Sequence, residues 1–275
     1  MNERIQLGFR NEKALINERI LSEREFPIEI KADLKERIIV LFVGEDKVFD
    51  EFLSALADYI INRYEIRILK RILSKSYGEL KPFQLKGILE NLLQLEDDPK
   101  LCRRKRHEVI KKGLYCYFKE NKMANVEGLV TFRLKEYEAL LTHVSERILD
   151  IYLMHKEYEE FVGLLRYFVG VQNDRVKLVH IVVKRHKMYT ILNELGEDIT
   201  NECISDFVSP DDISGDNFDD LLISILITLA PEKVIVHNGE EINNQELFTT
   251  IGSVFDKVEY CKGCNLCKAK AKCRT

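Results

Sequence analysis

The sequence has no tryptophan, only five prolines and no long apolar run. Its longest apolar stretch covers residues 221–230, includes Ser224 and Thr228, and reaches about half of the roughly 18 residues that span a bilayer. Glu3 and Arg4 lie where a secretory signal peptide would need apolar residues. These absences argue against a membrane span and a signal peptide, and we expect a cytoplasmic protein that does not contact a membrane.

Motifs of the common enzyme classes are also missing. The sequence contains neither phosphate-binding loop (G-x-x-x-x-G-K-[ST] or G-x-G-x-x-G), nor the nucleophile elbow G-x-S-x-G, nor the metalloprotease motif H-E-x-x-H. No charge of one sign dominates, because 42 basic and 46 acidic residues leave a net charge of −4. This balance argues against a protein whose whole surface binds nucleic acid. The missing motifs favour a protein that is not an enzyme, without deciding the question.

The N-terminal part of the chain alternates between strand and helix patterns. With 45% hydrophobic and 32% charged residues, the 275-residue chain is typical of a globular protein and long enough for one large domain or two modest ones. Apolar and β-branched runs predict short strands at residues 5–9, 28–30 and 38–43. The charged segment 12–25 predicts a helix between the first two strands.

A helical pattern covers residues 46–172 almost without interruption. Its clearest stripe consists of apolar residues three and four positions apart: Leu134, Tyr137, Leu141, Val144, Ile148 and Ile151. This spacing places all six side chains on one face of a helix. We therefore predict a central helical bundle.

The hydrophobic period changes near residue 173. Short β-branched runs predict strands at residues 176–183, 188–192, 234–236 and 258–260, and longer patterns predict helices at residues 218–229 and 244–255. The resulting order, β-β-α-β-α-β, is that of an α/β or α+β layer. The predicted fold class is mixed α and β and predominantly helical, with short strands at the N-terminus, a central helical bundle and this C-terminal layer.

These patterns divide the chain into three predicted regions. Residues 1–172 hold the N-terminal strands and the helical region, residues 173–260 form the C-terminal α/β or α+β region, and residues 261–275 form a cysteine-rich basic tail. A single-domain arrangement, in which the N-terminal strands pair with the C-terminal sheet, stays open.

Four of the seven cysteines lie in the last fifteen residues. Cys261, Cys264, Cys267 and Cys273 have the pattern C-x2-C-x2-C-x5-C, and Gly263 permits a tight turn between the first two. Thiolates at this density suit zinc or a 4Fe–4S cluster. The first three positions match the run of bacterial ferredoxins, but the last spacing differs and no proline follows. We predict a metal site at these four residues, and the alternative is a disordered basic tail with free thiols.

The other cysteines and the histidines give weaker signals. Cys102, Cys116 and Cys203 are scattered in helical or loop-like sequence and are expected to be free thiols, although Cys203 could supply a remote ligand. His237 is the most suggestive histidine, because it follows the predicted strand 234–236, where α/β proteins often place function. A lone histidine before a turn is more often structural, so it receives no predicted role.

A basic run begins at Arg103. On a helical wheel, Arg104, Lys105, Lys111 and Lys112 fall within one sector of about 120°. The predicted helix 103–112 thus carries a cationic face that could meet phosphate or an acidic protein surface. Few aromatic residues are interleaved with it to stack bases. We therefore favour a solvated helix face over nucleic-acid binding.

Two helical stretches carry a family resemblance. Residues 56–73 read LADYIINRYEIRILKRIL, and residues 128–172 begin GLVTFRLKEYEALLTHVSERILD. They resemble the YtxC-like sporulation family of endospore-forming bacteria. The resemblance implies a cytoplasmic protein linked to sporulation, and it implies no activity, cofactor or catalytic residue. We therefore expect a protein that acts by binding a protein partner and has a metal site in its tail. The alternatives are an iron–sulfur redox protein and a nucleic-acid-binding protein that uses the basic helix.

Overall fold

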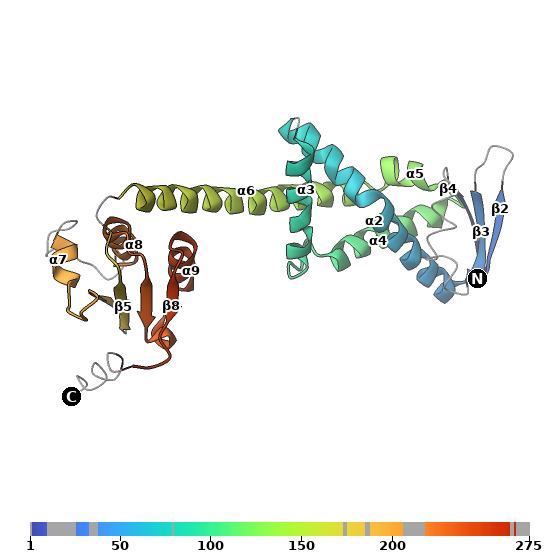
Figure 1. Ribbon diagram of the computed structural model, residues 1–275. Coiled ribbons are helices and arrows are strands. Elements are labelled where there is room, and N and C mark those ends of the chain that lie inside the picture. Colours follow the sequence, from blue (N-terminus) through green and yellow to red (C-terminus); the bar gives the residue numbers. More distant parts are fainter. Residues whose placement is uncertain are drawn as a thin grey trace. The chain divides into compact units, whose positions relative to one another are not determined.

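The computed structural model describes residues 2–9, 26–32, 38–78, 80–172, 175–184, 188–205, 218–264 and 267 (Figure 1). Within these residues the fold is mixed α and β and predominantly helical, which confirms the predicted fold class. The chain forms two compact units, Met1–Met154 and His155–Thr275, each with its own sheet. The division at residues 154 and 155 lies inside a helix. The predicted region boundaries at residues 172 and 260 stay predictions.

The sheet of the first unit has the strand order β2-β3-β1-β4. β1 (Asn2–Phe9) and β2 (Ile28–Ala32) each pair antiparallel with β3 (Ile38–Glu45). β4 (Met123–Asn125) joins β1 in parallel, inside a region that the sequence predicted to be helical almost without interruption. Three residues are too few to show a β period. β4 forms by pairing with the edge of β1 that β3 does not occupy. The predicted helix 12–25 lies outside the described residues.

Helices make up most of the first unit. They are α2 (Asp46–Tyr77), α3 (Pro82–Glu90), α4 (Arg103–Glu120), α5 (Val126–Gly128) and the first part of α6 (Lys135–Val171), with short helical turns η1 (Asn91–Leu95) and η2 (Leu129–Arg133). All six residues of the predicted α6 stripe are buried. They pack in one core with the inner faces of α2, α4, β1 and β3. The predicted central helical bundle is therefore present and includes the N-terminal strands in its core.

The sheet of the second unit has the order β6-β5-β7-β8. β5 (Val179–Lys184) and β6 (Met188–Leu192) form the predicted hairpin, and β7 (Val234–His237) and β8 (Val258–Tyr260) continue the sheet in parallel with β5. The helices are α7 (Thr200–Ser205), α8 (Phe218–Leu229) and α9 (Gln245–Val254). The predicted β-β-α-β-α-β order is confirmed, with α7 as an additional short helix. Among the described strands, no strand of one sheet pairs with the other sheet.

The two faces of the second sheet have different surroundings. Residues at alternate positions of a strand point to opposite faces. One set packs in the core with α8, α9 and the end of α6: Val179, Ile181, Val183, Val234 and Val236. The other set includes His180 on β5 and Ile235 and His237 on β7. The two histidines thus share the face that lies away from this core.

No helix among the described residues combines the length and the apolar character that crossing a membrane requires.

Candidate metal centre

The candidate site lies at the carboxyl ends of two neighbouring parallel strands, β7 and β8. β7 ends at His237 because the next residue, Asn238, adopts the left-handed conformation with φ 55° and donates its side-chain amide to the Val183 carbonyl at 3.2 Å. Beside it, the backbone N–H of Cys261 donates to the Val236 carbonyl at 2.8 Å and extends the pairing of β7 with β8 by one step. Strand pairing therefore brings Cys261 next to His237.

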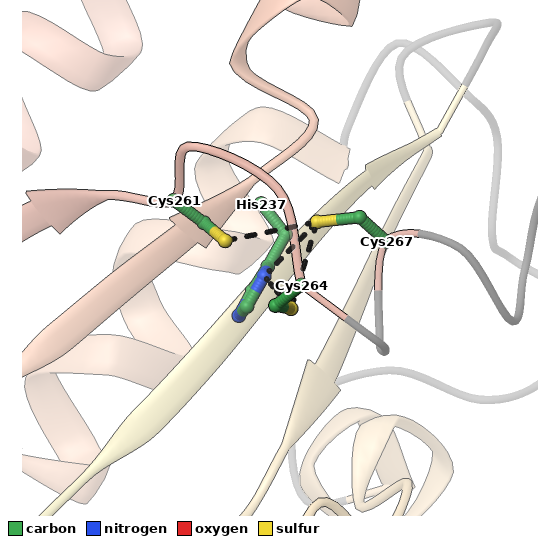
Figure 2. Close-up of side chains that lie close together, drawn as sticks. All are labelled: His237, Cys261, Cys264 and Cys267. Carbon is green, nitrogen blue, oxygen red and sulfur yellow. Dashed lines mark hydrogen bonds between the residues drawn. The ribbon is translucent and has the colours of Figure 1, made fainter.

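A tight turn then brings back the other two cysteines. Gly263 has φ +118°, which a side chain would disfavour, and its backbone N–H donates to the sulfur of Cys261 at 3.4 Å. Beyond this turn, Cys264 and Cys267 point toward the imidazole of His237 (Figure 2). One nitrogen and three sulfurs converge on a common centre as a result.

The ligand atoms of these four residues all lie within 4.8 Å of one another. The Nδ1 atom of His237 is 3.5 Å from the sulfur of Cys264 and 3.4 Å from the sulfur of Cys267. The sulfur of Cys267 is 3.8 Å from those of both Cys264 and Cys261. Imidazole nitrogen and thiolate sulfur are ligands of zinc and other transition metals. The group could therefore hold a metal ion.

These separations have the size of the edges of a coordination tetrahedron. With metal–sulfur and metal–nitrogen bonds of about 2.3 and about 2.05 Å, a regular tetrahedron has S···S edges of about 3.8 Å and S···N edges of about 3.5 Å. Four of the six interligand distances, 3.4 to 3.8 Å, agree with these values, and the other two are within 4.8 Å. Four of the six separations thus match those that one mononuclear ion requires.

Three of the four sequence-predicted metal ligands are in this group: Cys261, Cys264 and Cys267. Cys273 lies outside the described residues. His237 takes a place in the group that the sequence did not assign to it. The sequence indicates its position at a strand end, but assigning it as a ligand requires knowing that β7 and β8 are neighbours, which sequence patterns do not show.

The remaining cysteines lie in other elements. Cys102 is buried at the N-cap of α4, Cys116 is exposed on the same helix, and Cys203 lies in α7. The group of potential ligands does not include them.

The environment of His237 favours the neutral imidazole. The residue is 2% exposed, and its Nε2 atom lies 2.9 Å from Nδ1 of His180. Burial lowers the pKa of His237, and a charge on His180 would lower it further. Burial also lowers the pKa of His180. Neutral imidazole is the form that binds a metal.

The pKa of the Cys261 thiol reflects opposing effects. The backbone N–H of Gly263 stabilises the thiolate and lowers the pKa, whereas burial and the neighbouring thiols of Cys264 and Cys267 raise it. The net direction is upward. Neighbouring thiolates repel one another, so clustered thiols do not readily lose their protons together. A bound cation would offset the repulsion between the thiolates.

A cavity of about 500 Å³ borders the site. Its lining residues are His180, Ile235, His237, Glu259, Tyr260, Cys261 and Cys264. The carboxylate of Glu259 is 2.9 Å from the ammonium group of Lys233, so this acidic side chain already has a cationic partner.

Carboxylates lie beside the predicted cationic face of the basic helix, α4. Lys111 lies 2.7 Å from Asp50 and Lys112 lies 3.7 Å from Glu136, so acidic residues of other helices accompany half of the predicted cationic face. Arg104 and Lys105 both lie 3.7 Å from Glu108 on the same helix. Arg104, Lys105 and Lys112 remain exposed, as the predicted solvated face requires. The carboxylates beside them, which a helical wheel cannot show, reduce the positive charge of this face.

The chain resembles one curated relative, the Bacillus subtilis (strain 168) protein named "Uncharacterized protein YtxC". The two sequences are 29% identical over 137 residues, which is 48% of this chain and 46% of the relative. The chain thus matches about half the length of that protein. No solved structure matches.

The family comparison covers more of the chain. The model of the YtxC-like family matches residues 50–259, a range that includes His237 and ends two residues before Cys261. The match spans the helices of the first unit and most of the second, in agreement with the resemblance carried by residues 56–73 and 128–172. The chain belongs to the YtxC-like family.

Proposed function

We propose that the second unit binds one structural zinc ion through His237, Cys261, Cys264 and Cys267. The observation that carries the proposal is the agreement between four of the six interligand distances and the edges of a zinc tetrahedron. Four protein ligands would fill the coordination shell and leave no position for water or a substrate. A closed shell of this kind is typical of structural zinc sites, not catalytic ones.

The same distances favour zinc over the 4Fe–4S alternative. A four-iron cluster binds each protein thiolate to a different iron, which spreads the sulfurs farther apart than the edges of one tetrahedron. The sulfur of Cys267 lies only 3.8 Å from each of its two neighbours. Neutral imidazole as the fourth ligand also suits zinc.

The proposed ion would hold the segment that follows β8 against the sheet. β8 is only three residues long, and the segment after Gly263 returns to β7 through Cys264 and Cys267. Metal binding by such a segment adds directly to its folding free energy. The proposal includes a reducing, cytoplasmic location, because thiolate ligands must stay unoxidised.

Metal content and colour test the zinc site. We expect about one zinc per chain and no visible absorbance after purification under reducing conditions. Cys264→Ser and His237→Ala should each lose the metal, whereas Cys116→Ser, a change at an exposed cysteine of α4, should retain it. Cys273→Ser should also retain it if His237 is the fourth ligand. A brown, iron-containing protein, or wild type without stoichiometric metal, would contradict the proposal.

A second proposal concerns protein binding: an apolar stripe on α6 pairs with a second copy of the chain. Phe161, Leu164, Phe168 and Val171 are 43 to 52% exposed and lie three and four residues apart. Val162 and Leu165, on the neighbouring face of the same helix, pack in the core of the second unit. Apolar residues at this spacing form the seam of two-helix coiled coils, and such a seam is complementary to itself.

Charges favour an antiparallel pair. Glu157 and Glu160 are exposed before the stripe, and Arg175 is exposed after it. In a parallel pair, each glutamate would face the same glutamate of the second copy, and the like charges would repel. An antiparallel pair centred near residue 166 brings Glu157 toward the C-terminal end of α6 of the second copy, where Arg175 donates to the carbonyls of Val169 and Gly170.

Sedimentation velocity over a range of concentrations tests this pairing. Wild type should dimerise, and Phe161→Glu and Phe168→Glu should each shift the protein to monomer. Phe132→Glu is the matched control, because Phe132 is 69% exposed in η2 of the other unit. A wild type that remains monomeric, or a dimer that both stripe variants preserve, would contradict self-association.

The sporulation role implied by the family resemblance is part of the proposed function. Deleting the gene in an endospore-forming host should lower the count of heat-resistant spores, and the wild-type gene should restore it. An unchanged spore count would contradict that role without bearing on the zinc site.

A further inference from the structure

We propose that His180 is a positioning residue that holds His237 in the tautomer and orientation needed to bind the metal. This inference rests on the proposed zinc site and assigns a role to a residue outside the four ligands. Its basis is the hydrogen bond between the two imidazoles, with His180 Nδ1 at 2.9 Å from His237 Nε2.

The two nitrogens of His237 face different partners. Nδ1 lies 3.5 and 3.4 Å from the sulfurs of Cys264 and Cys267, so this nitrogen is the one directed at the metal position. A metal on Nδ1 requires that the proton of the neutral ring reside on Nε2. Nε2–H then donates to His180, whose Nδ1 must act as the acceptor. The hydrogen bond thereby selects the tautomer of both rings.

The sheet determines where His180 lies. In the parallel register, His180 on β5 is opposite Ile235 and Val182 is opposite His237. His180 and His237 are therefore two positions apart along neighbouring strands and point to the same face. The ring centroids are 5.1 Å apart with an interplanar angle of 36°. An acceptor placed on a strand interior holds its partner more firmly than one on a loop.

Metal-bound histidines commonly donate their second ring N–H to such an acceptor, and removal of the acceptor weakens metal binding by roughly 10- to 100-fold. Glu259, which lines the same cavity, is 2.9 Å from Lys233, so it has another partner. His180 is the group that contacts Nε2 of His237.

Zinc affinity in full-length variants tests the inference. His180→Leu removes the acceptor and should weaken zinc binding, measured by competition with a chelator, by roughly 10- to 100-fold. His180→Asn keeps an acceptor, the amide Oδ1, at the position of Nδ1 and should recover most of the affinity. The control is His143→Leu, because His143 is exposed in the first unit and bonds Glu146.

Nitrogen NMR of the histidine rings gives a second readout. In the zinc-bound wild type, His237 should carry its proton on Nε2 and His180 should carry its proton on Nε2 as well. This measurement requires no variant and so remains decisive if His180→Leu fails to fold. The opposite tautomer of His237, or a His180→Leu variant that binds zinc as tightly as wild type, would overturn the role of His180. A wild type that binds no zinc would instead overturn the proposed function.

Discussion

The two units of the chain bury polar groups in different ways. In the first unit, Glu65 and Arg106 are 3% and 2% exposed, and the Glu65 carboxylate is 3.1 Å from the Arg106 guanidinium and accepts a hydrogen bond from Tyr137 at 2.9 Å. In the second unit, His237 is equally buried but lies beside three thiols and a second histidine. Burial raises the pKa of Glu65 more than Arg106 lowers it, so the ion pair offsets only part of the cost of burying the carboxylate.

The two units differ in where the partners of their buried polar groups come from. The buried charges of the first unit pair with each other inside a large apolar core formed by three long helices and a sheet, although Arg106 Nε makes no hydrogen bond to the described residues. The buried ligands of the second unit would be satisfied by an ion from solution, under the proposal above. Removing one partner of a buried ion pair destabilises the fold around it, and removing the ion destabilises a fold that depends on metal. The units should therefore respond to different perturbations.

Metal removal should have the largest effect and should act on the second unit. Structural zinc in small domains contributes on the order of 10 kcal/mol, because binding and folding are coupled. We expect a chelator to remove amide-exchange protection from β7, β8 and the segment at Cys261, and to leave α2 and α4 protected. Hydrogen exchange with peptide-resolved mass spectrometry measures both. Equal loss of protection in the two units would contradict the prediction that only the second unit depends on metal.

Arg106→Met should have the next largest effect, in the first unit. It leaves the Glu65 carboxylate buried without its cation, and breaking a buried pair costs roughly 3–5 kcal/mol. Urea unfolding measures the loss, and zinc content should be unchanged. Arg104→Met is the control on the same helix, since its side chain is 83% exposed and should stay within about 0.5 kcal/mol of wild type. A loss below about 1 kcal/mol for Arg106→Met would show that the pair is not required.

Acidification should act on the second unit with a smaller effect. The pKa of His237 is lowered on folding, so the folded state binds protons less readily than the unfolded state. The stability contribution is complete above the ordinary pKa of about 6.5 and is lost as the pH falls below it. The slope is at most about 1.4 kcal/mol per pH unit for each proton. Thermal unfolding between pH 7.5 and 5.5 measures it, and a second unit that gains stability over this range would contradict the sign.

Asn244→Ala should have the smallest effect. Asn244 caps α9 by accepting the N–H of Leu247 at 3.1 Å, and it donates to Asp219 at 2.7 Å. Loss of an N-cap costs about 1 kcal/mol. Thr249→Ala, at an exposed position of the same helix, should stay within about 0.5 kcal/mol in the same unfolding assay. An unaffected Asn244→Ala variant would show that core packing alone holds α9.

Local patterns predicted most elements of the fold. The six-residue stripe from Leu134 to Ile151 is buried, the hairpin β5–β6 forms, and β8 has the predicted bounds of residues 258–260. These successes share a cause: helical and strand periods are carried by residues close together in the sequence. β4 was missed because its pairing with β1 joins segments more than a hundred residues apart.

The sequence by itself determined the fold class, the family resemblance and the three thiols Cys261, Cys264 and Cys267, because short spacing keeps them near one another in any compact conformation. Only the tertiary structure decided the rest of the candidate site. His237 lies 24 residues before Cys261, and they meet because β7 and β8 pair in parallel. The burial of Arg106 was decided in the same way, since Glu65 reaches it from a different helix. Ligand sets and buried charge pairs depend on strand register and on packing between distant segments. Local sequence patterns reveal neither the register nor the packing.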